Sequence, residues 1–342
     1  DSGDEDAEKT ADDMDIMSIA RSQETSSSKV RFDLDLPSED NDDLYLGEGI
    51  LLPEWDYKKQ QLLPEYCNLQ PMIAREMNAC ELPVHLRGKA NHIRAQFEML
   101  MPNRCWFNGQ TEGSELDVNA YITHVTDRIN GHVSPEIGLY RNLRNVNRDM
   151  ACLLLADLSL STDSWINNDS RIIDVIRDSI FLFSEALAAI GDPFSIYGFS
   201  SRRRNHVRFN TIKTFDEKYN DQVRGRIRTM EPGYYTRMGA AIRYSTRILE
   251  NAKASQKVLM LLTDGKPNDL DKYEGRYGIE DTRKAIHEAK HAGIHPFCVT
   301  IDDQAPEYLP YIFGVSSFVL IRKAIELPKK LPLLYAKLTR IN

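Results

Sequence analysis

Residues 151–161, ACLLLADLSLS, decide the fold, because a wholly apolar run ends there at an acidic residue. The run 152–156 is short and uniformly apolar, which is typical of a central parallel strand buried on both faces. Asp157, Ser159 and Ser161 follow at alternate positions. Ligands of open α/β sheets bind just outside the carboxyl ends of such strands. The three side-chain oxygens therefore predict a site for a hard cation, Mg²⁺ or Mn²⁺ and not zinc.

Two later stretches have the composition to complete this site. Residues 231–239, EPGYYTRMG, lead into a helical pattern and place Thr236 just before it. Residues 257–265, KVLMLLTDG, form a second buried strand that ends in a Thr-Asp-Gly sequence containing Asp264. D-x-S-x-S, a downstream Thr and a strand-terminal T-D-G occur here in that order. This order resembles the metal-ion-dependent adhesion site (MIDAS) of von Willebrand factor A (vWA) domains.

The resemblance implies a particular division of roles at the metal. Ser159, Ser161 and Thr236 would supply hydroxyl oxygens directly, whereas Asp157 and Asp264 would act largely through water. The remaining coordination position would then accept a carboxylate from another protein. On this basis Asp157→Ala is expected to abolish target activation while the domain still folds.

Alternation of strands and helices in the second half predicts an α/β domain, a mostly parallel sheet flanked by helices. The expected strands are 152–156, 195–199, 258–262, 296–301 and 318–321, with 207–215 as an extra edge strand. The expected helices are 171–190, 238–251, 279–292, 305–313 and 331–339, with Pro332 in the first turn of the last.

The chain is expected to divide into three parts. Residues 1–43 are dense in Asp, Glu and Ser and predict a disordered acidic linker, or alternatively an acidic tail that docks on a basic partner. Residues 44–148 predict a surface strap around LPEWDY (52–57), followed by a small helical module in which Asn108-Gly109 marks a hairpin. Residues 149–342 predict the vWA domain.

Composition limits the class of protein and its compartment. The chain has 342 residues, of which 42% are hydrophobic, and a net charge of -8 that argues against general nucleic-acid binding. No apolar run approaches the length of a membrane helix and no signal peptide is recognisable. Five scattered cysteines without a C-x-x-C pair are typical of a reducing compartment. We expect a cytoplasmic protein and, since the first residue is not Met, a fragment of a longer chain.

Further residues are expected on the face that carries the metal. Arg202, Arg203 and Arg204 follow the strand 195–199 and suit an acidic partner, although a solvated loop is the alternative. Tyr234 and Tyr235 lie beside Thr236 as candidate interface anchors, with packing of the loop as the alternative.

The motifs of common enzymes are missing from the sequence. No G-x-x-x-x-G-K-[ST] loop is present, so ATP hydrolysis by this chain is not expected. Residues 198–202, GFSSR, lack the final Gly of a nucleophile elbow, and Ser159 replaces the second acid of a D-x-D motif. We therefore predict a binding protein that is not an enzyme.

Several long stretches resemble the CbbO/NorD family from about residue 50 to the end. They are LLLADLSLSTDSW (153–165), YGFSSRRRNHVRF (197–209), EPGYYTRMGAAIR (231–243), LLTDGKPNDLDKYEGRYGIEDTR (261–283) and YLPYIFG (308–314), together with LPEWDY (52–57). Members of this family act as adaptors of a hexameric MoxR-class AAA+ ATPase, CbbQ or NorQ. The resemblance implies target recognition by this chain and ATP hydrolysis on the partner.

Two branches of the family remain open. CbbO with CbbQ reactivates inhibited Rubisco, and the loops YGFSSRRRNHVRF and IHPFCVTID favour this branch. NorD with NorQ matures nitric oxide reductase and is the alternative. A stand-alone vWA binding module and a metal-dependent hydrolase are the alternatives from other classes.

Overall fold

The computed structural model describes residues 44–74, 78–99, 105–131, 138–144, 149–167, 170–302 and 304–338. Residues 98–149 form one compact unit, and the rest of the described chain forms another. The predicted acidic linker, 1–43, lies outside the described residues. Among the described helices, none has the length and apolar character needed to span a bilayer.

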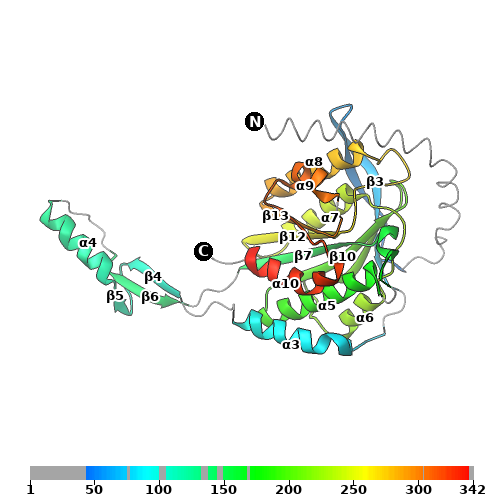
Figure 1. Ribbon diagram of the computed structural model, residues 1–342. Coiled ribbons are helices and arrows are strands. Elements are labelled where there is room, and N and C mark those ends of the chain that lie inside the picture. The colour runs from blue at the N-terminus through cyan, green and yellow to red at the C-terminus, as the bar shows by residue number, and fades with distance from the viewer. Residues whose placement is uncertain are drawn as a thin grey trace. The chain divides into compact units, whose positions relative to one another are not determined.

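The larger unit is built on a nine-stranded, mostly parallel sheet (Figure 1). The strands run in the order β1-β3-β11-β10-β7-β12-β13-β14, and β2 pairs with β3. Their bounds are β1 Leu44–Tyr45, β2 Ile50–Asp56, β3 Gln61–Ile73, β7 Met150–Asp157, β10 Phe194–Ser201, β11 Val207–Lys213, β12 Gln256–Thr263, β13 Ile294–Thr300 and β14 Phe318–Leu320. The predicted α/β class is confirmed, and each of the five main predicted strands lies on an observed one.

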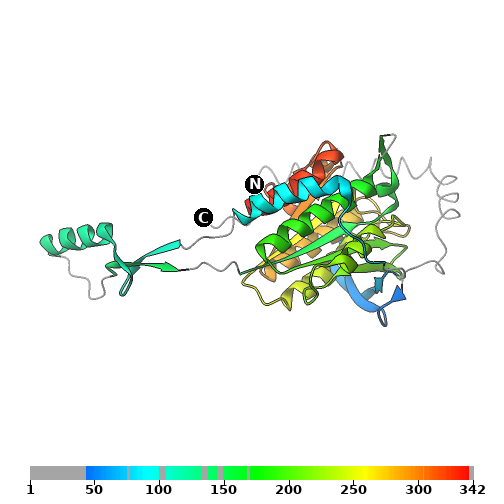
Figure 2. The same ribbon diagram turned by 90° about the horizontal axis from the view of Figure 1, so that it is seen from below.

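Helices cover both faces of this sheet, which explains the apolar run of the central strand (Figure 2). Cys152, Leu154 and Ala156 of β7 face one core cluster, and Leu153 and Leu155 face the other. The first core contains side chains of α3 (Val84–Glu98), α5 (Ile172–Ile190), α6 (Asp221–Arg228) and α10 (Leu327–Leu338). The second contains side chains of α7 (Met238–Glu250), α8 (Arg276–His291) and α9 (Ala305–Phe313).

The smaller unit consists of a three-stranded sheet and one helix. Its strands are β4 (Cys105–Gln110), β5 (Glu115–Leu116) and β6 (Tyr140–Arg144), in the order β4-β6-β5, and its helix is α4 (Val118–Ile129). The Asp117 side chain caps α4 by accepting from the backbone amides of Asn119 and Ala120. The expected hairpin turn at Asn108-Gly109 is wrong, because both residues lie inside β4, where Gly109 has a φ of +69° and the pairing with β6 is irregular.

The domain boundary expected at residue 148 separates residues that belong to one compact unit in the structure. The stretch 44–73 is not a strap on the surface, because β1, β2 and β3 extend the main sheet and β3 pairs in parallel with β11. Leu52, Cys67 and Leu69 from these strands are fully buried in the second core. Helix α3 belongs to the first core, so the predicted helical module is divided between the two units.

Two smaller expectations are corrected in the same region of the sheet and at the end of the chain. The predicted edge strand 207–215 is an internal strand, because β11 lies between β10 and β3. The last helix begins at Leu327, so Pro332 lies inside α10 and not in its first turn.

Candidate metal-binding site

The candidate metal-binding site forms where two adjacent parallel strands end. Strands β7 and β12 pair in parallel with Ala156 opposite Leu262, so the residues that follow each strand emerge together. Asp157 is the last residue of β7 and is fully buried. Its Oδ2 accepts a hydrogen bond of 2.8 Å from the hydroxyl of Thr263, the last residue of β12. Asp157 therefore lies at the carboxyl edge of the sheet, where the sequence predicted a binding site.

The loop after β7 is held in one conformation by short-range hydrogen bonds. Asp157 Oδ1 accepts from the backbone amide of Ser159 at 3.0 Å, which turns the chain directly after the strand. The Thr162 hydroxyl donates to the Ser159 carbonyl oxygen at 2.7 Å within a short 3₁₀ helix, Leu160–Asp163. The Leu160 amide donates to the Tyr234 carbonyl oxygen at 2.9 Å. This last bond ties the D-x-S-x-S loop to the loop that carries Thr236.

The hydroxyl groups of the site form a continuous chain. Ser159 Oγ lies 2.9 Å from Ser161 Oγ, and Ser161 Oγ donates to Asp264 Oδ1 at 2.8 Å. Hydrogen bonds from Ser159, Thr263 and Thr236 oppose the rise in the pKa of Asp157 that burial causes. The structure thus brings together all five residues that the sequence predicted as metal ligands, Asp157, Ser159, Ser161, Thr236 and Asp264.

The donors of this cluster fit a hard divalent cation. All five are side-chain oxygens, three neutral hydroxyls and two carboxylates, and hard oxygen donors suit Mg²⁺. Burial and the nearby charge of Asp157 raise the pKa of Asp264 to about 7, so the metal-free site disfavours two negative charges. In the described part of the chain, no group of three or more His, Cys, Asp and Glu side chains is arranged to hold a metal. A metal here would therefore depend on the hydroxyls.

The loop carrying Thr236 is held between two neighbouring segments. Ser201, at the end of β10, and Tyr235 exchange two backbone hydrogen bonds of 2.8 Å each. Thr236 and Asn268 exchange another pair, of 2.7 and 2.9 Å. These backbone bonds fix the position of Thr236, which is 6% exposed.

A buried arginine next to Thr236 was missed by the sequence reasoning. Arg237 is 1% exposed and forms ion pairs with Glu54, Asp269 and Asp271, the one with Asp269 at 3.1 Å. Its guanidinium also lies 4.3 Å from the ring centroid of Tyr273. Glu54 belongs to β2 and lies 183 positions away in the sequence. Glu54 of β2 thus helps to hold Arg237, the residue that directly follows the candidate metal ligand Thr236.

The two aspartates of this network also hold the predicted arginine loop. The Arg203 amide donates to Asp269 at 2.8 Å, and the Arg204 amide donates to Asp271 at 3.1 Å. The side chains of Arg203 and Arg204 are exposed, and that of Arg202 is half-buried. The arginine loop follows β10 at the edge of the sheet where β7 also ends.

One of the two predicted interface tyrosines is not at the surface. Tyr234 is 1% exposed, and the Arg208 guanidinium lies 5.1 Å from its ring centroid. Its backbone has a φ of +67° and its carbonyl oxygen accepts from Leu160, so Tyr234 packs the loop. Tyr235 is half-buried.

The fold and this cluster define the class of protein, and comparison with known proteins agrees. Residues 168–323 match the von Willebrand factor type A domain family, so the chain contains a vWA domain. The match includes Thr236 and Asp264 but begins after the D-x-S-x-S loop. The vWA domain of Catenulispora acidiphila is one similar solved structure, with a TM-score of 0.41 and 15% identity over 69% of this chain and 50% of that one.

Relatives that align over most of the chain identify the family. Protein NorD of Stutzerimonas stutzeri is 52% identical over 86% of this chain and 48% of its own length. Protein NorD of Brucella suis is 39% identical over 99% of this chain and 53% of its own. An uncharacterized protein of Pseudomonas aeruginosa is 49% identical over 99% of this chain and 55% of its own. The chain belongs to the CbbO/NorD family, and it spans about half the length of the curated relatives it matches.

Proposed function

We propose that this chain is a metal-dependent protein-binding module that recognises an acidic residue of a client protein. The connected cluster at the ends of β7 and β12 is the observation that carries this proposal. Ser159, Ser161 and Thr236 would hold Mg²⁺ through their hydroxyls, and Asp157 and Asp264 would balance its charge. The bound ion would supply an electrophilic position for a carboxylate oxygen of the client.

The loop that carries Arg203 and Arg204 supports recognition of an acidic surface. The exposed Arg203 and Arg204 side chains follow β10 at the edge of the sheet that carries the cluster. Guanidinium groups form paired hydrogen bonds with carboxylates and so favour an acidic partner. With the ion bound, the hydroxyls and carboxylates of the cluster would be engaged with the metal, so the site would serve to bind a client.

Relatives named NorD favour one branch of the family for the client. We infer that the chain acts as a NorD-type adaptor. It would then present nitric oxide reductase to a MoxR-class AAA+ ATPase of the NorQ type. Hydrolysis of ATP would then occur on the ATPase. The CbbO-type role in Rubisco activation, favoured by two loop sequences, is the second candidate, and a stand-alone vWA module is the third.

Measurement of Mg²⁺ binding together with client capture tests this proposal. The informative variant is Ser161→Ala, because Ser161 is exposed and contributes a hydroxyl that contacts both Ser159 and Asp264. We expect calorimetry to show Mg²⁺ binding that weakens about tenfold in this variant, which is the size of effect of losing one ligand or its support. Ser164→Ala, in the same loop and also exposed, is the matched control and should bind normally.

Capture experiments with purified proteins distinguish the candidate clients. Nitric oxide reductase and the NorQ-type ATPase are expected to be retained in Mg²⁺ and the reductase released in EDTA. Mg²⁺-dependent retention of Rubisco instead would assign the chain to the CbbO-type role. If Mg²⁺ does not bind to the wild-type chain, the metal-dependent mechanism is wrong.

A further inference from the structure

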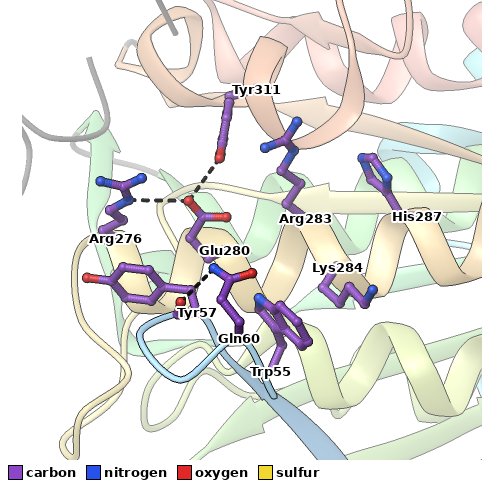
Figure 3. A pocket seen from close by; sticks show the side chains of 9 residues that line it. All are labelled: Trp55, Tyr57, Gln60, Arg276, Glu280, Arg283, Lys284, His287 and Tyr311. Atoms are coloured by element: carbon purple, nitrogen blue, oxygen red, sulfur yellow. Dashed lines mark hydrogen bonds and ion pairs between the residues drawn. The ribbon is translucent and has the colours of Figure 1, made fainter. Parts of the chain in front are cut away.

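A second site lies on the flank of the larger unit, away from the metal cluster residues. A pocket of about 330 Å³ is lined by the turn between β2 and β3, by one face of α8 and by Tyr311 of α9 (Figure 3). Trp55, Tyr57 and Tyr311 supply its aromatic wall. None of these three side chains is fully exposed or fully buried, so their rings are held in place and remain accessible.

Cationic side chains of α8 lie against these rings. Arg276, Arg283, Lys284 and His287 recur at helical spacing and therefore share the face of α8 that lines the pocket. The Arg283 guanidinium lies 3.9 Å from the ring centroid of Tyr311, and Lys284 Nζ lies 4.8 Å from that of Trp55. Such contacts hold each cation against the aromatic wall of the pocket.

The pocket carries an excess of positive charge. Its one carboxylate, Glu280, accepts from the Tyr311 hydroxyl at 2.8 Å and from Arg276 Nε at 3.3 Å (Figure 3). Burial, and then the positive charges of Arg283, Lys290, Lys284 and His291, lower the pKa of His287. A ligand for this pocket should therefore bring carboxylates.

The chain itself contains a segment of that chemistry. Residues 1–43 hold 15 acidic and four basic residues, so the other 299 residues carry +3 of the net charge of -8. The first 15 residues, DSGDEDAEKTADDMD, hold eight of these acids and a single Lys. The two parts of the chain are thus opposite in charge.

Chain length decides which acidic residues can reach the pocket. Leu44 pairs with Ile73, and Trp55 pairs with Leu62, so 11 residues of β3 separate the start of β1 from the pocket. That separation is about 36 Å at 3.3 Å per strand residue. Of the acids between 33 and 43, only Asp33, 11 residues from Leu44, could cover it, and only with the chain almost fully extended. Asp15 is 29 residues from Leu44 and has a reach of up to about 100 Å.

We propose that the pocket binds the acidic stretch 1–15 of the same chain, with carboxylates against Arg283 and Lys284 and the chain backbone across Trp55. Attachment through the intervening segment gives an effective concentration that reaches the millimolar range for a flexible linker, so weak contacts suffice. The pocket would then fix the linker against the sheet through α8 and β2. This inference does not depend on metal binding.

Zero-length crosslinking of the whole chain tests the proposal. A carbodiimide joins a carboxylate to a lysine amine only where the two are in contact. We expect Lys284 to be joined to acids of residues 1–15 about tenfold more often than the exposed Lys253, because both lysines share the tether but only Lys284 lines the pocket. The signal should fall in about 1 M salt, where the Debye length is about 3 Å.

Two variants and a labelling control make the result decisive. Arg283→Glu should abolish the crosslink at Lys284, whereas Lys253→Glu, an equal change of charge outside the pocket, should leave it unchanged. Mixing isotopically labelled and unlabelled chains shows whether the joined residues belong to one molecule. Crosslinks spread evenly over the exposed lysines, or formed only between two chains, would overturn the proposal.

Discussion

Asp157 shows how burial changes the interpretation of a mutation at the metal site. It is 0% exposed, and its carboxylate accepts from the Ser159 amide and the Thr263 hydroxyl. The expectation that Asp157→Ala spares the fold is therefore revised, since the variant leaves the buried Ser159 amide without its acceptor and the Thr263 hydroxyl with only the Gly265 carbonyl oxygen at 3.1 Å. Ser161 is exposed, so its substitution separates metal binding from folding.

Stability of the Asp157→Ala variant can be measured directly. In EDTA, where metal binding does not contribute to stability, we expect the free energy of unfolding to fall by about 2 kcal/mol, because an unsatisfied buried donor costs about 1–3 kcal/mol and removal of the buried charge offsets part of that. Urea unfolding followed by circular dichroism gives the value. Asp163→Ala, in the same loop, removes only an ion pair with Arg171 in which 46% of the Asp163 side chain is exposed, and should lower the free energy of unfolding by less than about 1 kcal/mol.

Lys213 gives the fold a dependence on pH that is separate from the metal site. It is 3% exposed, its Nζ donates to the carbonyl oxygens of Phe194 at 2.6 Å and Thr214 at 3.0 Å, and burial lowers its pKa to about 8. The cost of burying the ammonium is present in full below pH 8. It decreases as the pH rises towards the ordinary lysine value of 10.5.

The Lys213→Met variant should therefore lose part of the pH dependence of stability. Between pH 7 and 9.5 the lysine of the wild type is expected to add about 2 kcal/mol to the free energy of unfolding, which the variant lacks. Denaturation at several pH values measures this difference. An identical pH profile for both proteins would show that the folded lysine has an ordinary pKa.

At the level of elements, β2 supports the candidate metal site from outside the matched vWA residues. Glu54 of β2 is 2% exposed and pairs with Arg237, which directly follows Thr236. Glu54→Gln removes one of three negative charges around a buried guanidinium. Loss of one partner of a buried ion pair costs about 3–5 kcal/mol, and Asp269 and Asp271 should reduce that to about 2 kcal/mol.

The same substitution should also weaken Mg²⁺ binding, because Arg237 loses one of the three carboxylates that hold it beside Thr236. Calorimetry with Mg²⁺ and urea unfolding measure the two effects together. Glu48→Gln changes an exposed acid just before β2 and is the control. If Glu54→Gln lowers stability but leaves the Mg²⁺ affinity unchanged, β2 does not position the site.

Elements with strong local patterns were predictable from the sequence, and those with distant partners were not. The runs 152–156 and 258–262 are uniformly apolar because β7 and β12 are covered on both faces, and their adjacency juxtaposes Asp157 and Asp264. Strand β3 contains Pro64 and Pro71 and several polar residues, so its pattern does not indicate a strand. The pairing of Glu54 with Arg237 has no local signal at all.

The distribution of the cores sets the limits of the folding unit. Both core clusters are built from residues before 98 and after 149, and neither contains a residue of the smaller unit. The second core contains Leu52, Cys67 and Leu69, which lie more than 90 residues before the matched vWA region at 168–323. The first core also contains Leu327, Leu331 and Tyr335, which follow the match, so the folding unit is larger than the family match at both ends and is interrupted by an inserted unit.

Two deletions test this description of the whole molecule. Replacement of residues 100–148 by a Gly/Ser linker should leave both cores intact, so cooperative unfolding and Mg²⁺ affinity should change by no more than about 1 kcal/mol. Removal of residues 44–74 exposes the edge of β11 and deletes four buried apolar side chains, Leu52, Cys67, Leu69 and Met72, where burial of an apolar side chain contributes about 1.5–3 kcal/mol. That variant should lose its cooperative transition. If the second variant still unfolds cooperatively, residues 44–74 are not needed for the folding unit. If the first variant does not fold, the larger unit depends on the inserted one.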